Sequence, residues 1–246
     1  MTRVFALISL ALGALLTTGA FIAVFFFVPI ANGGELAQVA NIGGEQVTHQ
    51  LWFSQKIFYF HVPVAIASFA ALALGAWHSI QYLRTKRPVC DLRARTAMEV
   101  GLIFIILTMI SGDLWTRSDW NTWWNWDPRL TTYLILMLLV IAYFILRVQI
   151  ESPERRARIS AVFGIIAFAN AALSMLIPRL MESMHPVVLS GSADSGLTPP
   201  MLAAFLTALF GMLFIGFGLY YLRSMQLELA ERLALVQARY DEAQGS

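Results

Sequence analysis

Six long and largely apolar runs, each 19 to 27 residues in length, constrain the fold of this 246-residue chain more than any other feature. A helix needs about 20 apolar residues to cross roughly 30 Å of hydrocarbon. Charged residues make up only 13% of the chain, about half of what is usual in a soluble domain. We therefore expect an all-α integral membrane protein whose six transmembrane helices lie near residues 4–30, 57–83, 97–115, 129–148, 159–177 and 199–222.

Helix-start signals support three of these spans. Asp127-Pro128, Ser152-Pro153 and Thr198-Pro199 each place a favourable N-cap residue before a proline. Proline suits the first helical position because its missing N–H would have no partner there. We expect helices to begin at these three prolines.

The first apolar run and the single cysteine each exclude a simple alternative. The run near 4–30 follows Arg3, as in a signal peptide, but it is too long for a signal sequence, and we expect a retained helix. Cys90 alone cannot form an internal disulfide, and the chain contains no C-x-x-C-H motif for covalent haem attachment.

The distribution of lysine and arginine predicts how the helices are oriented. Cytoplasmic loops of membrane proteins are enriched in these residues. One side holds thirteen of them, namely Arg3, Arg84, Lys86, Arg87, Arg93, Arg95, Arg147, Arg155, Arg156, Arg158, Arg223, Arg232 and Arg239. The other side holds four, which are Lys56, Arg117, Arg129 and Arg179. We expect both termini to be cytoplasmic.

Two parts of the chain follow from these expectations. Residues 1–222 form the membrane domain, with an outer loop at about 114–128. Residues 223–246 alternate apolar and charged positions with a helical period, which predicts a cytoplasmic amphipathic tail. Such a tail can dock a partner helix or lie in solvent near the headgroups.

The outer loop at about 114–128 is unusually rich in tryptophan. Five of the seven tryptophans of the chain fall within twelve residues, at Trp115, Trp120, Trp123, Trp124 and Trp126. An aromatic belt at the membrane interface accounts for one or two tryptophans per helix end. On a helix or a tight turn, the spacing of Trp120, Trp123 and Trp124 would place them on one face. This pattern predicts a broad apolar surface that could stack against a large flat ligand.

Two of the four histidines are expected on the same side as these tryptophans. His61 follows the start of the second span in K-I-F-Y-F-H-V-P, and His185 follows the fifth span in M-E-S-M-H-P. His78 lies 17 residues after His61, about 25 Å along the same helix, and cannot share a site with it. His49 lies in the outer segment 31–56. His61 and His185 could together bind haem iron as axial ligands, or each could serve as an interfacial hydrogen-bonding residue.

Three charged residues flank these groups. Asp127 is a good N-cap for the fourth helix and Arg129 lies in its first turn. Arg129 and Arg179 are candidates to bind haem propionates, because a guanidinium can donate two parallel hydrogen bonds to a carboxylate. Interfacial anchoring is the alternative role for Arg129.

An ion-coupled transporter or channel is a competing class. Such proteins usually keep ionisable residues inside their spans. The spans offer few beyond His78 and Glu99, which lie near their inner ends. The chain has no G-x-x-x-x-G-K-[ST] loop, so any ATP-driven step must belong to a partner. Nothing in the sequence indicates a nucleic-acid partner.

The segment W-N-T-W-W-N-W-D-P-R-L-T resembles the WWD signature W-G-x-W-W-x-W-D-x-R-L-T of haem-handling proteins of cytochrome c biogenesis. K-I-F-Y-F-H-V-P is similar to the entry of the second helix in the haem exporter protein C (CcmC) family. Six helices, a second outer histidine and a chain near 250 residues fit the same family, so the resemblance covers nearly the whole chain.

The resemblance implies a binding and transfer component, not an enzyme, in a bacterial inner membrane or its organellar counterpart. It implies that haem b is held on the periplasmic side by His61 and His185 as axial ligands. Delivery to the haem chaperone CcmE is implied too, in a complex with the ABC-transporter subunits CcmA and CcmB and the small subunit CcmD. The segment that meets haem and chaperone would comprise Trp120, Trp123, Trp124, Trp126 and Asp127.

Two details of the signature differ from the family pattern. Asn121 stands where the signature has glycine, and asparagine tolerates left-handed backbone geometry best after glycine. The sequence W-D-P is closer to that of the related cytochrome c synthase proteins CcsA and CcmF, which are similar only over this segment. A subunit of a thioether-forming synthase (haem lyase) is therefore the nearer alternative function.

Overall fold

The computed structural model of the chain describes residues 2–28, 39–42, 45–48, 55–185 and 197–244. Within them, six helices are long and apolar enough to cross a membrane. Their bounds are α1 Thr2–Phe26, α2 Gln55–Thr85, α3 Pro88–Asp119, α4 Pro128–Gln149, α5 Pro153–Leu180 and α6 Pro199–Gln244. The expected multi-pass helical membrane protein is confirmed.

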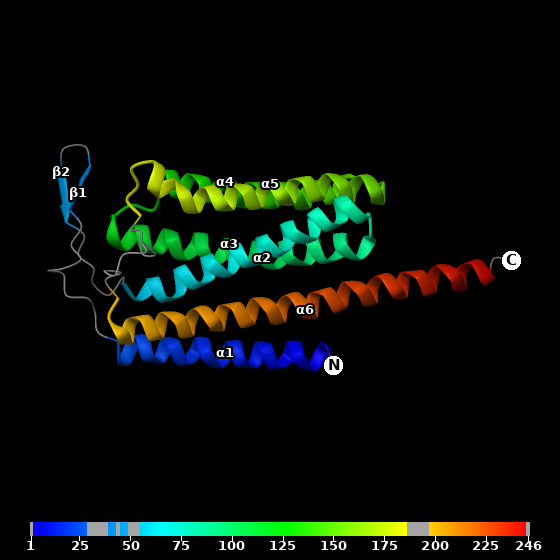
Figure 1. The fold of residues 1–246 in the computed structure, drawn as a ribbon, viewed down its shortest axis with the longest axis horizontal. Coiled ribbons are helices and arrows are strands. Elements are labelled where there is room, and N and C mark those ends of the chain that lie inside the picture. The colour runs from blue at the N-terminus through cyan, green and yellow to red at the C-terminus, as the bar shows by residue number, and fades with distance from the viewer. Residues whose placement is uncertain (1, 29–38, 43–44, 49–54, 186–196, 245–246) are drawn as a thin grey trace.

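The helices form three antiparallel pairs stacked in layers, as Figure 1 shows. The pair α4–α5 lies on one side, α2–α3 in the middle, and α1–α6 on the other side. Both termini lie at one end of the bundle, and the ends of α1, α3 and α5 lie with the starts of α2, α4 and α6 at the opposite end. We call these the terminal end and the loop end.

A short hairpin, not expected from the sequence, lies in the segment between α1 and α2. Strands β1 (Val39–Ile42) and β2 (Glu45–Thr48) pair antiparallel, with Val39 opposite Thr48. His49 lies outside the described residues.

Several helix bounds differ from the expected spans. α1 ends at Phe26 and not near residue 30. α3 begins at Pro88, nine residues before the expected 97, because Pro88 takes the first helical position and polar residues extend the helix beyond its apolar run. α6 runs without a break through residue 222 to Gln244. Hydropathy marks the length that suits hydrocarbon, whereas helices continue wherever backbone hydrogen bonding does.

The expected helix starts at Pro128, Pro153 and Pro199 are confirmed. The Asp127 side chain accepts a hydrogen bond from the Arg129 amide at 2.8 Å, and Ser152 accepts one from the Arg155 amide at 3.5 Å. Each cap satisfies an amide that has no partner inside its own helix.

Ionic contacts join the helices at both ends of the bundle. At the terminal end, Arg147 of α4 makes a two-pronged ion pair with Asp91 of α3, at 2.6 and 2.8 Å. Arg223 of α6 pairs with Glu99 of α3. At the loop end, the buried Lys56 of α2 donates hydrogen bonds to two backbone carbonyls, that of Val24 in the last turn of α1 and that of Val28 just after it. A cation there complements the negative end of the α1 dipole.

The α1–α6 pair packs through a seam of small residues. A Cβ atom added at Gly211 of α6 would overlap the Thr17 hydroxyl and lie 2.9 Å from the Thr17 amide of α1. One added at Gly13 would lie 2.8 Å from the Gly211 carbonyl oxygen. Small residues let two membrane helices approach closely, so that van der Waals contact can hold them together.

We expect Gly211→Ala to destabilise the protein by about 1–3 kcal/mol, because the added methyl group forces the two backbones apart. The matched control is Gly19→Ala on the partner helix α1, since nothing lies within 4 Å of a Cβ at Gly19. Thermal denaturation of the detergent-purified protein measures both. Equal melting temperatures for the two variants would contradict the close seam.

Candidate functional site

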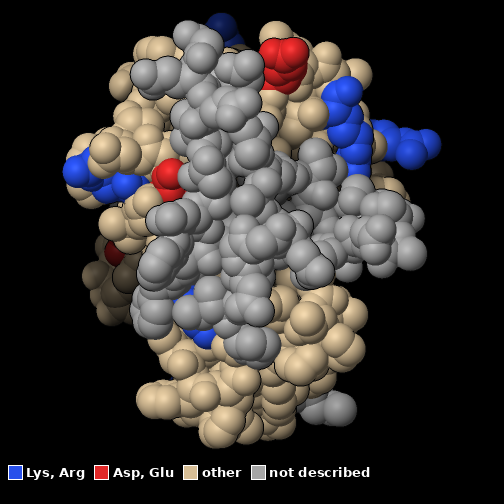
Figure 2. Space-filling view, turned by 90° about the vertical axis from the view of Figure 1, so that its left-hand side faces the viewer, with Lys and Arg blue, Asp and Glu red and all other residues tan. Residues whose placement is uncertain are grey.

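The predicted site residues gather at the loop end, which faces the viewer in Figure 2. Side chains other than Lys, Arg, Asp and Glu make up most of the described surface visible there. Two segments carry the site. One is the tryptophan segment, residues 115–127, which leads from α3 into α4, and the other is the segment 183–185 after α5.

The Asp127 carboxylate joins these two segments. Besides capping α4, it accepts hydrogen bonds from the Met184 amide at 2.7 Å and from the Ser183 hydroxyl at 2.9 Å. Asn125 adds a contact from its side-chain amide to the Met184 sulfur at 3.3 Å. Asp127 is only 7% exposed. A single buried carboxylate therefore fixes the start of α4 against the residues that precede His185.

His61 is held in a defined orientation near the end of the second turn of α2. Its Nδ1 atom lies 3.0 Å from the Ser111 hydroxyl of α3. When that hydroxyl donates to the Leu107 carbonyl, 2.8 Å away, it accepts from the imidazole. In that arrangement Nδ1 of neutral His61 carries the proton, and Nε2 keeps its lone pair. A Cβ at Gly112 would lie 3.1 Å from the imidazole, so glycine makes room for the ring.

His185 lies beside Asp127 at the other side of the site. Its Nδ1 atom is 3.6 Å from the carboxylate, too far for a hydrogen bond, and has no hydrogen-bond partner. The imidazole side chain is 19% exposed. His61 and His185 both interact electrostatically with Arg129, so the two imidazoles lie on the same side of the bundle.

Burial and neighbouring charges together set the pKa values of Asp127 and His185. Burial raises the pKa of the Asp127 carboxyl, but the adjacent His185 and hydrogen bonds from the Met184 and Arg129 amides outweigh it and hold that pKa well below its usual range. Burial lowers the pKa of His185, the Asp127 carboxylate opposes this, and Arg129 adds to it, so the net shift is downward. Near neutral pH, Asp127 is ionised and His185 is a neutral imidazole.

The tryptophans divide into two groups. Trp115 packs edge-on against His61, with ring centroids 5.6 Å apart, and Trp120 packs edge-on against His185 at 5.4 Å. Trp123 and Trp126 are 59% and 76% exposed. Trp124 is half-buried and contacts Trp126. Each imidazole thus has an aromatic neighbour, while further indole rings remain on the surface.

The prediction that Trp120, Trp123 and Trp124 share one face of a helix is wrong. α3 ends at Asp119, and Trp120 is its C-cap, so residues 120–126 do not follow helical spacing. The chain reverses at Asn121, whose φ of 54° lies in the left-handed region. The expected turn is therefore kept without the glycine of the signature. The Arg117 guanidinium donates to the Asn121 carbonyl at 2.8 Å and also lies over the Trp123 ring.

Two arginines approach the same site. Arg129 in the first turn of α4 interacts electrostatically with Asp127 and with both His61 and His185. Arg179 near the end of α5 is exposed and interacts with Arg129. The two guanidinium groups give this part of the loop end a positive field.

Comparison with known protein families decides the affiliation. The family model described as Heme exporter protein C matches residues 48–239, which include the tryptophan segment and both site histidines. The chain belongs to this family.

Individual relatives match stretches of 119 to 193 residues. The chain is 32% identical over 155 residues to Heme exporter protein C of Rhodobacter capsulatus, covering 61% of this chain and 55% of the relative. It is 34% identical over 119 residues to that of Paracoccus denitrificans, covering 48% and 49%. The protein of Bradyrhizobium diazoefficiens is 29% identical over 193 residues, 73% of each chain. The matched part thus spans about half the length of the first two relatives.

Sequence reasoning missed several residues of this family member's site. Ser111 and Gly112, which orient and accommodate His61, carry no recognisable motif, and only the packing of α2 on α3 reveals them. Ser183 is a similar case. Asp113, a half-buried carboxylate two residues before Trp115, could have been found from the sequence, because an acidic residue inside an apolar span is itself a signal.

Asp127→Asn is expected to reduce stability by about 2 kcal/mol at pH 7, since charge-assisted hydrogen bonds from Ser183, Met184 and Arg129 are weakened. The folded-state pKa of Asp127 is depressed. Its contribution is therefore present above the unfolded pKa of about 3.9 and is lost as the pH falls further. The gap in melting temperature between wild type and variant should narrow below pH 4. Glu182→Gln, at an exposed neighbouring position, is the control and should show no gap.

Proposed function

We propose that this chain binds haem b at the loop end through His61 and His185 and passes it on for cytochrome c maturation. The curated relatives named Heme exporter protein C support a role in haem delivery. In this role the chain is a binding and transfer component, and haem is its cargo. The first relatives are matched over only about half their length. The whole activity of those relatives is therefore proposed for this chain and not taken over from them.

One observation carries the proposal, namely the state of the two imidazoles. Histidines that bind a metal usually donate their other ring N–H to a nearby polar group, which fixes tautomer and orientation. His61 meets this condition through Ser111, and His185 is 3.6 Å from a carboxylate that could accept the same kind of bond. Each Nε2 would then bind iron, one on either face of the porphyrin.

The surroundings suit the rest of the cargo. Trp115 and Trp120, beside the imidazoles, would exclude water from the iron, and apolar indole faces suit a porphyrin ring. Arg129 and Arg179 would hold the propionates, which are carboxylates that a guanidinium can bind with two hydrogen bonds. The positive field of both arginines favours an anionic group at this place.

The partners follow from the family and from the exposed surface. We assign release of haem to the chaperone CcmE, which would dock on the exposed Trp123 and Trp126. CcmA, CcmB and CcmD would complete an ABC-type complex and supply any ATP-driven step. The excess of lysine and arginine at the terminal end supports the proposal that this end lies in the cytoplasm and the loop end in the periplasm of a bacterial inner membrane. The tail 223–244 of α6 would then be cytoplasmic.

Absorption spectra of the purified protein test the ligands directly. With the haem chaperone co-expressed, the wild type should show a low-spin haem band. His61→Ala and His185→Ala should each lose most of it, because one axial bond is removed. His78→Ala is the matched control, since His78 lies far along α2 and bonds Tyr220 instead. His49→Ala should also leave the band unchanged. Unaltered spectra in the first two variants would move the ligands to a partner.

The two groups of tryptophans should behave differently. Trp120→Ala removes the ring beside His185 and should reduce bound haem several-fold. Trp126→Ala, at the most exposed of these positions, should leave haem bound but slow its transfer to the chaperone. Haem content per chain and the rate of haem appearance on added chaperone separate the two effects. An equal loss of haem content in both variants would favour one continuous stacking surface.

A further inference from the structure

A partly open cavity of about 220 Å³ lies between α2, α3 and α6, and its lining residues on α2 follow His61 towards the terminal end. Ala67, Ala71 and Leu74 line it from α2, Ala97 and Val100 from α3, and Phe217 from α6. It reaches the outer surface of the bundle, because Phe217 and another lining residue, Ala70, are exposed. All these residues belong to helices that are long and apolar enough to span a membrane. The mouth of the cavity therefore faces lipid.

On each of the three helices, the face that lines the cavity continues to a polar residue nearer the terminal end. On α2, the positions 67, 71 and 74 continue by helical spacing to His78. On α3, Ala97 and Val100 are preceded on the same face by the exposed Arg93. On α6, Tyr220 lines the cavity and lies 3.2 Å from His78 Nε2 through its hydroxyl. Arg93 interacts electrostatically with both His78 and Tyr220.

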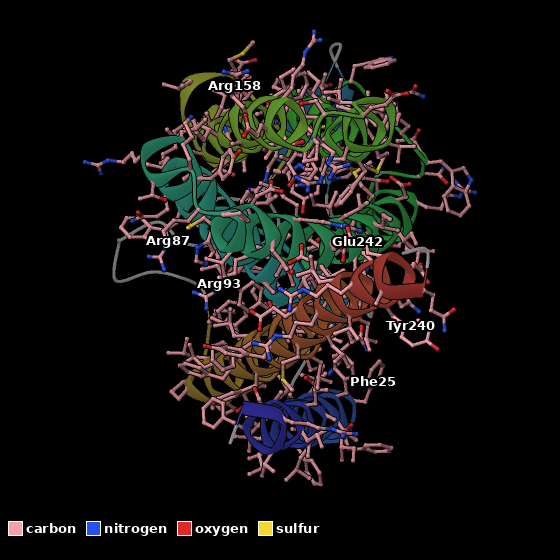
Figure 3. The ribbon with its side chains drawn as sticks, turned by 90° about the vertical axis from the view of Figure 1, so that its right-hand side faces the viewer. Phe25, Arg87, Arg93, Arg158, Tyr240 and Glu242 are labelled. Carbon is pink, nitrogen blue, oxygen red and sulfur yellow. The ribbon has the colours of Figure 1, made fainter. Side chains whose placement is uncertain are left out.

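Figure 3 looks onto the terminal end and shows Arg93 between the ribbons of α3 and α6. Arg158 lies in another layer, with α5. The cavity is thus an apolar groove whose polar end carries a cation. We infer that it binds one acyl chain of an anionic phospholipid, with the lipid phosphate held by Arg93 and the Tyr220–His78 pair.

Size and charge decide in favour of this occupant. The volume is below the roughly 300–1,000 Å³ of pockets that take drug-sized ligands, so a porphyrin macrocycle is too large, whereas part of one narrow hydrocarbon chain can lie in the groove while the rest stays in the surrounding lipid. An acyl chain also needs no polar partner along the alanine-lined walls. Basic pockets between transmembrane helices on the cytoplasmic side are suited to anionic lipid headgroups, and the terminal end has the excess of basic residues.

Native mass spectrometry of the full-length protein tests this inference. The protein is reconstituted in phosphatidylcholine nanodiscs containing phosphatidylglycerol and then released into detergent. We expect one phosphatidylglycerol per chain to remain bound when phosphatidylcholine is stripped. Arg93→Gln should lower the bound fraction several-fold, and Arg93→Lys should largely restore it. Arg158→Gln, an exposed arginine at the same end, is the matched control and should bind as the wild type does.

A second pair of variants tests the groove itself. Ala70→Phe would fill the mouth of the cavity and should reduce phosphatidylglycerol retention, while Ala172→Phe, at an exposed position on α5, should not. Both positions are exposed, so both variants should fold, which their melting temperatures check. Equal retention of the two lipids, or variants that match their controls, would overturn the inference. Displacement of the bound lipid by added haem would also overturn it, because the groove would then take porphyrin.

Discussion

Hydrocarbon offers backbone groups no hydrogen-bond partners, and this constraint shapes the whole molecule. Each of the six spans must satisfy its own N–H and C=O groups, which only a helix can do for a single segment. Polar chemistry is consequently confined to the ends of the bundle. The terminal end holds the Asp91–Arg147 and Glu99–Arg223 pairs, and the loop end holds His61, His185 and the tryptophan segment.

At the loop end, one buried carboxylate fixes the positions of the two segments that carry the site. Asp127 is read from the sequence as a helix cap, and it is one, but its other oxygen contacts reach residues 56 and 57 positions away. A carboxylate that organises two loops replaces the rigidity that helices provide elsewhere. It also brings a negative charge beside His185, where it can orient a neutral imidazole. Structure and proposed chemistry therefore depend on the same group.

Much of this arrangement could be predicted from the sequence, and the limits have physical causes. Span number and the proline helix starts at Pro128, Pro153 and Pro199 follow from local composition and from stereochemistry. Asn121 could be expected to keep the turn because its backbone preference is local too. The partners of His61 and His185 could not, since Ser111 and Asp127 reach them only after helices distant in sequence have packed. The start of α3 at Pro88 was missed because hydropathy does not register a polar helical extension.

The continuous course of α6 has a mechanical consequence. Its 46 residues correspond to roughly 70 Å, more than twice the thickness of the hydrocarbon core. The glycine seam binds its membrane half to α1 so tightly that the two must tilt together. A small angular movement of this pair would be enlarged at the C-terminal end of α6, as at the end of a lever. Whatever holds that end also limits how far the pair can lean within the bilayer.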